Sequence, residues 1–80
     1  MTNDEILAQF TRILRDLLGD ESIVLSMTSR RVDVPGWDSF NYVNFIAIAE
    51  MELGVKFGVA DVESFENVGA IVAKTQQLLG

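Results

Sequence analysis

The chain has 80 residues, enough for a single domain (1–80) and too few for two. Hydrophobic residues make up 49% of it, which supports a packed core, while the absence of cysteine and histidine excludes disulfides, thiolate metal sites and the usual Ser-His-Asp or Cys-His catalytic arrangements. The net charge of −6 argues against nucleic acid and anionic membrane as partners, and we expect neither an enzyme nor a metal site.

The first predicted helix lies near the N-terminus. Thr2 and Glu5 match a capping box, in which the two residues satisfy each other's free backbone N–H groups. Gly19 is a natural stop, because glycine tolerates the left-handed backbone that often follows a helix. The apolar residues between these ends recur with helical spacing and form one stripe: Ile6, Leu7, Phe10, Ile13, Leu14, Leu17 and Leu18.

Residues 20–37 show no sustained periodicity and predict a long loop, which is uncommon in a compact domain unless it has a function. Pro35 and Gly36 suit the centre of a turn, because proline presets φ and glycine accepts a positive φ. Arg30 and Arg31 are interpreted as a solvated basic pair, with contact to a phosphate or a partner as the alternative. Four apolar residues are expected to fold back onto the core: Ile23, Val24, Leu25 and Met27.

The second predicted helix begins with Asp38 as its N-cap and runs to about Leu53, ending at Gly54. Its core face consists of Tyr42, Phe45, Ile46, Ala49 and Leu53. A second apolar stripe on roughly the opposite side consists of Phe40, Val43, Ala47 and Met51. Asn44 and Glu50 flank this stripe. One apolar face is enough for a helix in a small bundle, so the second is either covered by the long loop or exposed for docking, and we favour docking.

The remainder of the chain predicts one short helix and one longer helix. Residues 61–65 form a single helical turn with Val62 and Phe65 facing inward. Asn67 is a good N-cap for the last helix. The apolar stripe of that helix consists of Val68, Ile71, Val72, Thr75, Leu78 and Leu79. The predicted fold class is therefore all-α: a small four-helix bundle of three main helices and one short helix, with a long loop after the first.

Acidic residues are concentrated in the second part of the chain. From Val32 onward there are seven acids against two lysines, a net charge of −5, which indicates either a basic protein partner or simply a solvated acidic surface. The acidic N-terminus does not resemble a signal peptide, and the longest wholly apolar run, residues 45–49, is too short to span a bilayer. We expect a cytoplasmic monomer without membrane insertion.

Ser39 lies where the Pro-Gly turn leads into the second helix, and we expect it to be exposed at the first helical position. Backbone N–H groups there lack intrahelical partners, and a phosphodiester on the serine oxygen would gain roughly 0.3–1 kcal/mol from the helix dipole. Asp38 caps the helix and is also available to a modifying enzyme. Asp-Ser before an apolar run is by itself an ordinary helix start, and nothing in the chain activates the serine, so any modification needs a partner.

Two stretches carry a family resemblance: DVPGWDSFNYVNFIAIAEMELGVKF and, after a short turn, SFENVGAIVAKTQQLL. With the length, the acidity, the helix order and the long first loop, they resemble the acyl carrier protein family over almost the whole chain. The resemblance implies a four-helix bundle that a phosphopantetheinyl transferase modifies, with coenzyme A as donor and magnesium. Ser39 is then the attachment residue. The arm's thiol carries acyl, hydroxyacyl or aminoacyl groups as thioesters, which accounts for a chain without cysteine.

The resemblance also implies partners. The second helix would be the recognition helix, whose apolar face meets the phosphopantetheinyl transferase and the enzymes that load and transfer acyl groups. The predicted partner-binding residues are Phe40, Val43, Asn44, Ala47, Glu50 and Met51. The alternative from a different class is an unmodified helical adaptor that docks partners through the same face.

The sequence departs from the housekeeping pattern of this family. Phe40 replaces the usual leucine after the serine, and Asn41 and Asn44 stand where fatty-acid carriers often have acids. Trp37 is more typical of specialised, stand-alone carriers, and the Gly-Gly-x-Ser motif of peptidyl carriers is absent. These departures predict a dedicated carrier for a specialised intermediate, in which Tyr42 restricts the length of a sheltered acyl chain.

Overall fold

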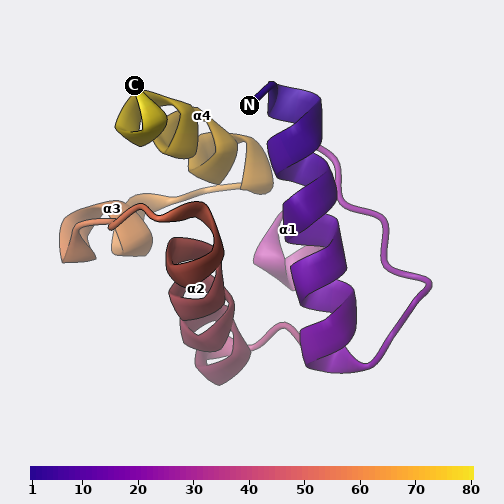
Figure 1. The fold of residues 1–80 in the computed structure, drawn as a ribbon. Helices are drawn as coiled ribbons and strands as arrows, with labels where there is room; N and C mark the ends of the chain where they lie inside the picture. Colours follow the sequence, from indigo (N-terminus) through magenta and orange to yellow (C-terminus); the bar gives the residue numbers. More distant parts are fainter.

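The computed structural model describes all residues, 1–80, and consists of helices and connecting segments without strands. The helices are α1 (Asn3–Leu18), α2 (Ser39–Leu53), α3 (Val59–Ser64) and α4 (Val68–Leu79), with a short 3₁₀ helix, η1 (Arg31–Asp33), in the loop after α1. In Figure 1, α1 and α2 stand side by side and run in opposite directions, and α1 packs against both α2 and α4. The predicted all-α four-helix bundle is confirmed.

The helix ends lie where capping groups satisfy free backbone groups. The Thr2 hydroxyl accepts a hydrogen bond from the Glu5 N–H at 3.1 Å, and the Glu5 carboxylate accepts one from the Thr2 N–H at 2.7 Å. These bonds, the backbone one first, hold the pKa of the Glu5 carboxyl below its ordinary value. Gly19 and Gly54 end α1 and α2 at φ 65° and 67°. Among the four helices, only α3 differs from its predicted bounds: it starts at Val59, two residues earlier than expected.

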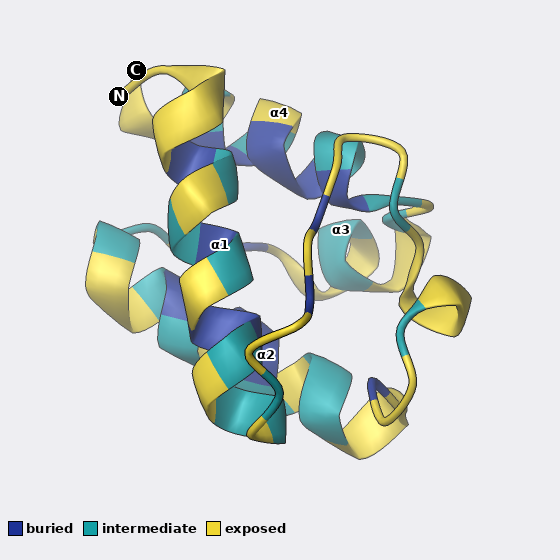
Figure 2. Ribbon diagram, turned by 90° about the vertical axis from the view of Figure 1, so that its right-hand side faces the viewer, coloured by how far each residue is buried: buried dark blue, intermediate teal, exposed yellow.

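A row of aromatic rings joins α1, α2 and the loop in the core. The rings of Phe10 and Phe45 meet edge to face with centroids 5.3 Å apart, and Trp37 packs edge to face on Phe45 at 5.2 Å. Each such pair adds about 0.5–1.5 kcal/mol beyond the burial of its area. Figure 2 shows the buried parts of α1 and α4 as dark blue segments between half-buried and exposed ones. The segment that leads into α2 is therefore fixed to the core by Trp37, which is 4% exposed.

The long loop folds back onto the core less completely than expected. Ile23 and Leu25 are buried, whereas Val24 is 78% exposed and Met27 is also exposed, so the expectation was wrong for the latter two. Figure 2 shows this alternation along the loop. Val24 faces water because successive side chains of an extended segment point to opposite sides, so it cannot reach the core between Ile23 and Leu25. Met27 lies in a turn, where this alternation ends.

The middle of the same loop is hydrogen-bonded to the start of α4. The N–H groups of Val68 and Gly69 donate to the carbonyls of Ser29 and Met27, both at 2.8 Å. These amides belong to the first turn of α4 and have no partner within the helix. A Cβ at position 69 would lie 2.5 Å from the Met27 carbonyl oxygen, so glycine is what allows this approach. The contact holds the loop against α4.

The C-terminal end of α4 is less buried than its apolar stripe predicts. Leu78 and Leu79 are 40% and 41% exposed, so the apolar stripe of α4 is not buried at its C-terminal end. The Gln76 side chain donates to the Met1 carbonyl at 2.6 Å and to Asn3 Oδ1 at 3.0 Å, so the two termini lie close together (Figure 2). None of the four helices has the length and apolar composition needed to cross a membrane.

Candidate functional site

Ser39 is exposed and is the first residue of α2, as the sequence predicts. The chain reaches it through a turn centred on Pro35 and Gly36, in which Gly36 has φ 86° and the Trp37 N–H donates to the Val34 carbonyl at 3.2 Å. A positive φ at the third residue is the requirement of a type II turn. The buried Trp37 then anchors the chain two residues before Ser39.

The first turn of α2 is held by Asp38 and Asn41. The Asp38 carboxylate accepts a hydrogen bond from the Asn41 N–H at 2.9 Å, and the Asp38 carbonyl accepts one from the Tyr42 N–H at 2.8 Å. The Asn41 side chain donates to the Gly36 carbonyl at 2.9 Å, a tie between helix and turn that the sequence analysis missed. The amides of Ser39 and Phe40 have no partner within the helix. A phosphate on the Ser39 oxygen therefore fits this helix terminus.

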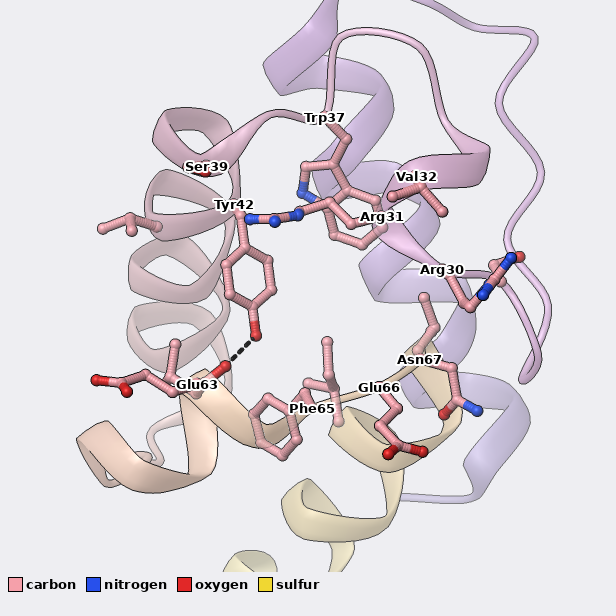
Figure 3. A pocket seen from close by; sticks show the side chains of 15 residues that line it. Arg30, Arg31, Val32, Trp37, Ser39, Tyr42, Glu63, Phe65, Glu66 and Asn67 are labelled. Atoms are coloured by element: carbon pink, nitrogen blue, oxygen red, sulfur yellow. Dashed lines mark hydrogen bonds between the residues drawn. The ribbon is translucent and has the colours of Figure 1, made fainter.

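A cavity of about 850 Å³ opens beside Ser39, bordered by η1, α2, α3 and the start of α4 (Figure 3). Eight of its fifteen lining residues are hydrophobic. A smaller cavity of about 420 Å³ continues along α2 and α3, and Val43, Val62 and Glu63 line both. The sequence analysis did not predict this cavity, because its walls come from segments far apart in the chain.

Tyr42 joins α2 to α3 across the cavity wall. Its hydroxyl donates to the Val62 carbonyl at 2.6 Å, which Figure 3 shows as a dashed line. The Arg31 guanidinium carbon lies 5.1 Å from the centre of the Tyr42 ring. Burial raises the pKa of the Tyr42 phenol, and the positive charge of Arg31 opposes this rise less strongly.

The cavity also has polar groups at its rim. Arg30 and Arg31 are both exposed, as expected of a solvated pair. They differ in their contacts, because Arg30 forms an ion pair with Asp33 at 3.7 Å and Arg31 forms none. Trp37 Nε1 is buried without a hydrogen-bond partner, and an unsatisfied buried donor of this kind costs about 1–3 kcal/mol.

The second apolar stripe of α2 is exposed. Phe40 is 75%, Val43 61% and Met51 80% exposed, and Ala47 between them is exposed as well. The long loop therefore does not cover this face, and that alternative is excluded. The flanking residues Asn44 and Glu50 are half-buried, and the Glu50 carboxylate accepts a hydrogen bond from the Phe57 N–H at 2.8 Å, which ties the end of α2 to the next segment.

Changing Tyr42 to phenylalanine is expected to lower the free energy of unfolding by about 1 kcal/mol, because the Val62 carbonyl loses its donor. The raised folded-state pKa adds a pH dependence. The stabilisation by the neutral phenol is fully present below the unfolded-state pKa and is lost as pH rises through the folded-state pKa. Urea unfolding of both proteins at neutral and alkaline pH measures this. Equal midpoints at neutral pH would contradict the prediction.

Comparison with known proteins gives matches of similar length both in sequence and in structure. Among models of protein families, none matches the chain. An acyl carrier protein of Thermotoga maritima is 30% identical over 79 residues, which cover 99% of this chain and 98% of the relative. The solution NMR structure of a holo acyl carrier protein from Geobacter metallireducens has a TM-score of 0.85 at 30% identity, over 92% of this chain and 85% of that one. Sequence and fold agree along nearly the whole length, and the chain belongs to the acyl carrier protein family.

Proposed function

We propose that this chain carries acyl groups as thioesters on a phosphopantetheine arm attached to Ser39, and presents them to partner enzymes. The position of Ser39 carries the proposal: an exposed hydroxyl at a helix N-terminus, beside free amides and at the edge of a largely apolar cavity. A carrier needs no catalytic group of its own, which agrees with a chain without histidine or cysteine. Family membership supports the carrier role.

The residues around Ser39 fit phosphopantetheine. The free amides of Ser39 and Phe40 would hold the phosphate, and the bound group would supply the thiol that the chain lacks. Asp38 keeps its role as the helix cap, and its exposed carboxylate would be recognised by the phosphopantetheinyl transferase with coenzyme A as donor. The cavity beside Ser39 would shelter the cargo from water.

The exposed face of α2 is the proposed docking surface for the transferase and for the enzymes that load and transfer acyl groups. A contiguous apolar patch on a small protein often marks an interaction site. Acidic side chains lie near it, with Glu50 on α2 and Glu63 on α3, both lining the smaller cavity that adjoins this face. A partner with apolar side chains surrounded by basic ones matches this surface, and the acidic groups would speed its association.

Intact mass spectrometry tests the attachment. The native chain is incubated with coenzyme A, magnesium and a broad-specificity phosphopantetheinyl transferase, and a gain of one phosphopantetheine is expected, placed at Ser39 by fragmentation. Circular dichroism of the same sample shows that it is folded. No gain with several transferases, in a folded sample, would instead favour the unmodified adaptor.

Changing Phe40 to alanine is expected to lower the kcat/KM of the transferase roughly 30-fold, equivalent to about 2 kcal/mol, as for an aromatic anchor removed from an interface. Stability is expected to remain unchanged, because this side chain is 75% exposed. Val24→Ala is the control: it shortens an equally exposed apolar side chain in the long loop, outside this face. Equal kcat/KM values for the two variants would refute the assignment of the docking surface.

A further inference from the structure

The cavity wall next to Ser39 contains two hydrogen-bond donors that nothing in the chain satisfies. Trp37 is 4% exposed, and its indole nitrogen is buried without a partner. The Arg31 guanidinium belongs to none of the four ion pairs of the protein and is held over the ring of Tyr42. Both residues line the cavity together with Ser39.

The carboxylates around these two side chains are either already bonded to another group or lie on the other side of the cavity. The Asp33 carboxylate pairs with Arg30, and the Asp38 carboxylate accepts from the Asn41 amide. The two carboxylates that line the cavity, those of Glu63 and Glu66, lie on the opposite side of it in Figure 3. The wall formed by Arg31 and Trp37 therefore offers donors without an acceptor.

We propose that Arg31 and Trp37 bind an oxygen atom of the cargo, so that this carrier favours acyl groups with a hydroxyl, keto or carboxylate oxygen over plain hydrocarbon chains. The inference rests on the proposed attachment at Ser39, because cargo on that residue enters the cavity that these two side chains line. In Figure 3 the indole nitrogen is turned toward the Arg31 side chain. Arg31 is exposed and held only by its contact with Tyr42, so it can move to admit an acceptor.

The single tryptophan of the chain provides a direct readout, since Trp37 gives the only indole ¹H–¹⁵N signal in an NMR spectrum. The native chain is prepared with the arm alone and with butyryl, hydroxybutyryl or succinyl thioesters, and intact mass confirms each loading. We expect the indole proton to shift downfield in the hydroxybutyryl and succinyl forms. In the butyryl form it should stay at its position in the unloaded form.

Two variants identify the donors. Arg31→Met keeps the length of the side chain and removes its donors, and is expected to reduce the downfield shift. Arg30→Met is the matched control and should leave the shift unchanged, because Arg30 pairs with Asp33. Equal indole positions in the butyryl and hydroxybutyryl forms would overturn the inference, and so would a full shift already present with the arm alone. A chain that never gains the arm would refute the proposed function itself.

Discussion

Replacing Ser39 with alanine is expected to abolish the attachment of phosphopantetheine and to leave the fold unchanged. The fold should persist because the hydroxyl is exposed and α2 is capped by Asp38 instead. Alanine is also a better helix former than serine. The attachment should vanish because the transferase needs a hydroxyl at the helix terminus, and a methyl group cannot form the phosphodiester. Intact mass after incubation with coenzyme A, magnesium and the transferase measures the loss.

Ser64→Ala is the matched control, since Ser64 is also an exposed serine on a helix but lies at the end of α3. It is expected to gain one phosphopantetheine like the native chain. Circular dichroism and the urea midpoint show whether both variants are folded. A mass gain that persists in Ser39→Ala would place the arm on another residue. If Ser39→Ala is unmodified but also unfolded, its lack of a mass gain does not support attachment at Ser39.

The helices could be predicted from the sequence because their ends depend on neighbouring residues. Thr2 with Glu5, Asp38 and Asn67 each accept a hydrogen bond from a backbone N–H three residues away, and this geometry needs no tertiary structure. Gly19 ends α1 by an equally local effect, the left-handed conformation of its own backbone. The exposed position of Ser39 follows from the same logic, since it comes directly after an N-cap residue.

The loop and the cavity could not be predicted in the same way, because they depend on contacts between distant segments. Nothing local shows that Val24 faces water while Leu25 is buried, or that Trp37 packs on Phe45. The bond from the Tyr42 hydroxyl to Val62 spans twenty residues of sequence. The sequence did carry one usable signal: a tryptophan next to a tight turn has a large apolar area, which favours its burial against the core.

The resemblance and the structure contribute different parts of the site. The Asp-Ser motif identifies Ser39, and the structure adds what surrounds it, including the free amides of the first turn, the tie from Asn41 to Gly36 and the cavity. Asn41 illustrates the difference. In the sequence, Asn41 is notable only because fatty-acid carriers often have an acid at this position. In the structure, its side-chain amide donates to the Gly36 carbonyl and holds the helix to the turn, which a carboxylate could not do because it has no proton to donate.

Changing Phe10 to alanine is expected to lower the free energy of unfolding by about 3–5 kcal/mol, since the side chain is fully buried. Small domains have marginal stability, with about 5–15 kcal/mol typical of proteins in general, so this loss is a large fraction of the total. Phe10 supports the ring of Phe45, which in turn supports Trp37, so the vacancy also loosens the segment that leads into Ser39. Urea unfolding followed by circular dichroism measures the loss.

Phe40→Ala removes the same atoms from a side chain that is 75% exposed and serves as the control. It is expected to change the free energy of unfolding by no more than about 0.5 kcal/mol, as for most surface substitutions. The two variants thus separate the two kinds of phenylalanine in this chain. Phe10 is expected to maintain the fold and to affect modification only through it, whereas Phe40 is expected to affect docking alone. Similar urea midpoints for both variants would contradict this division.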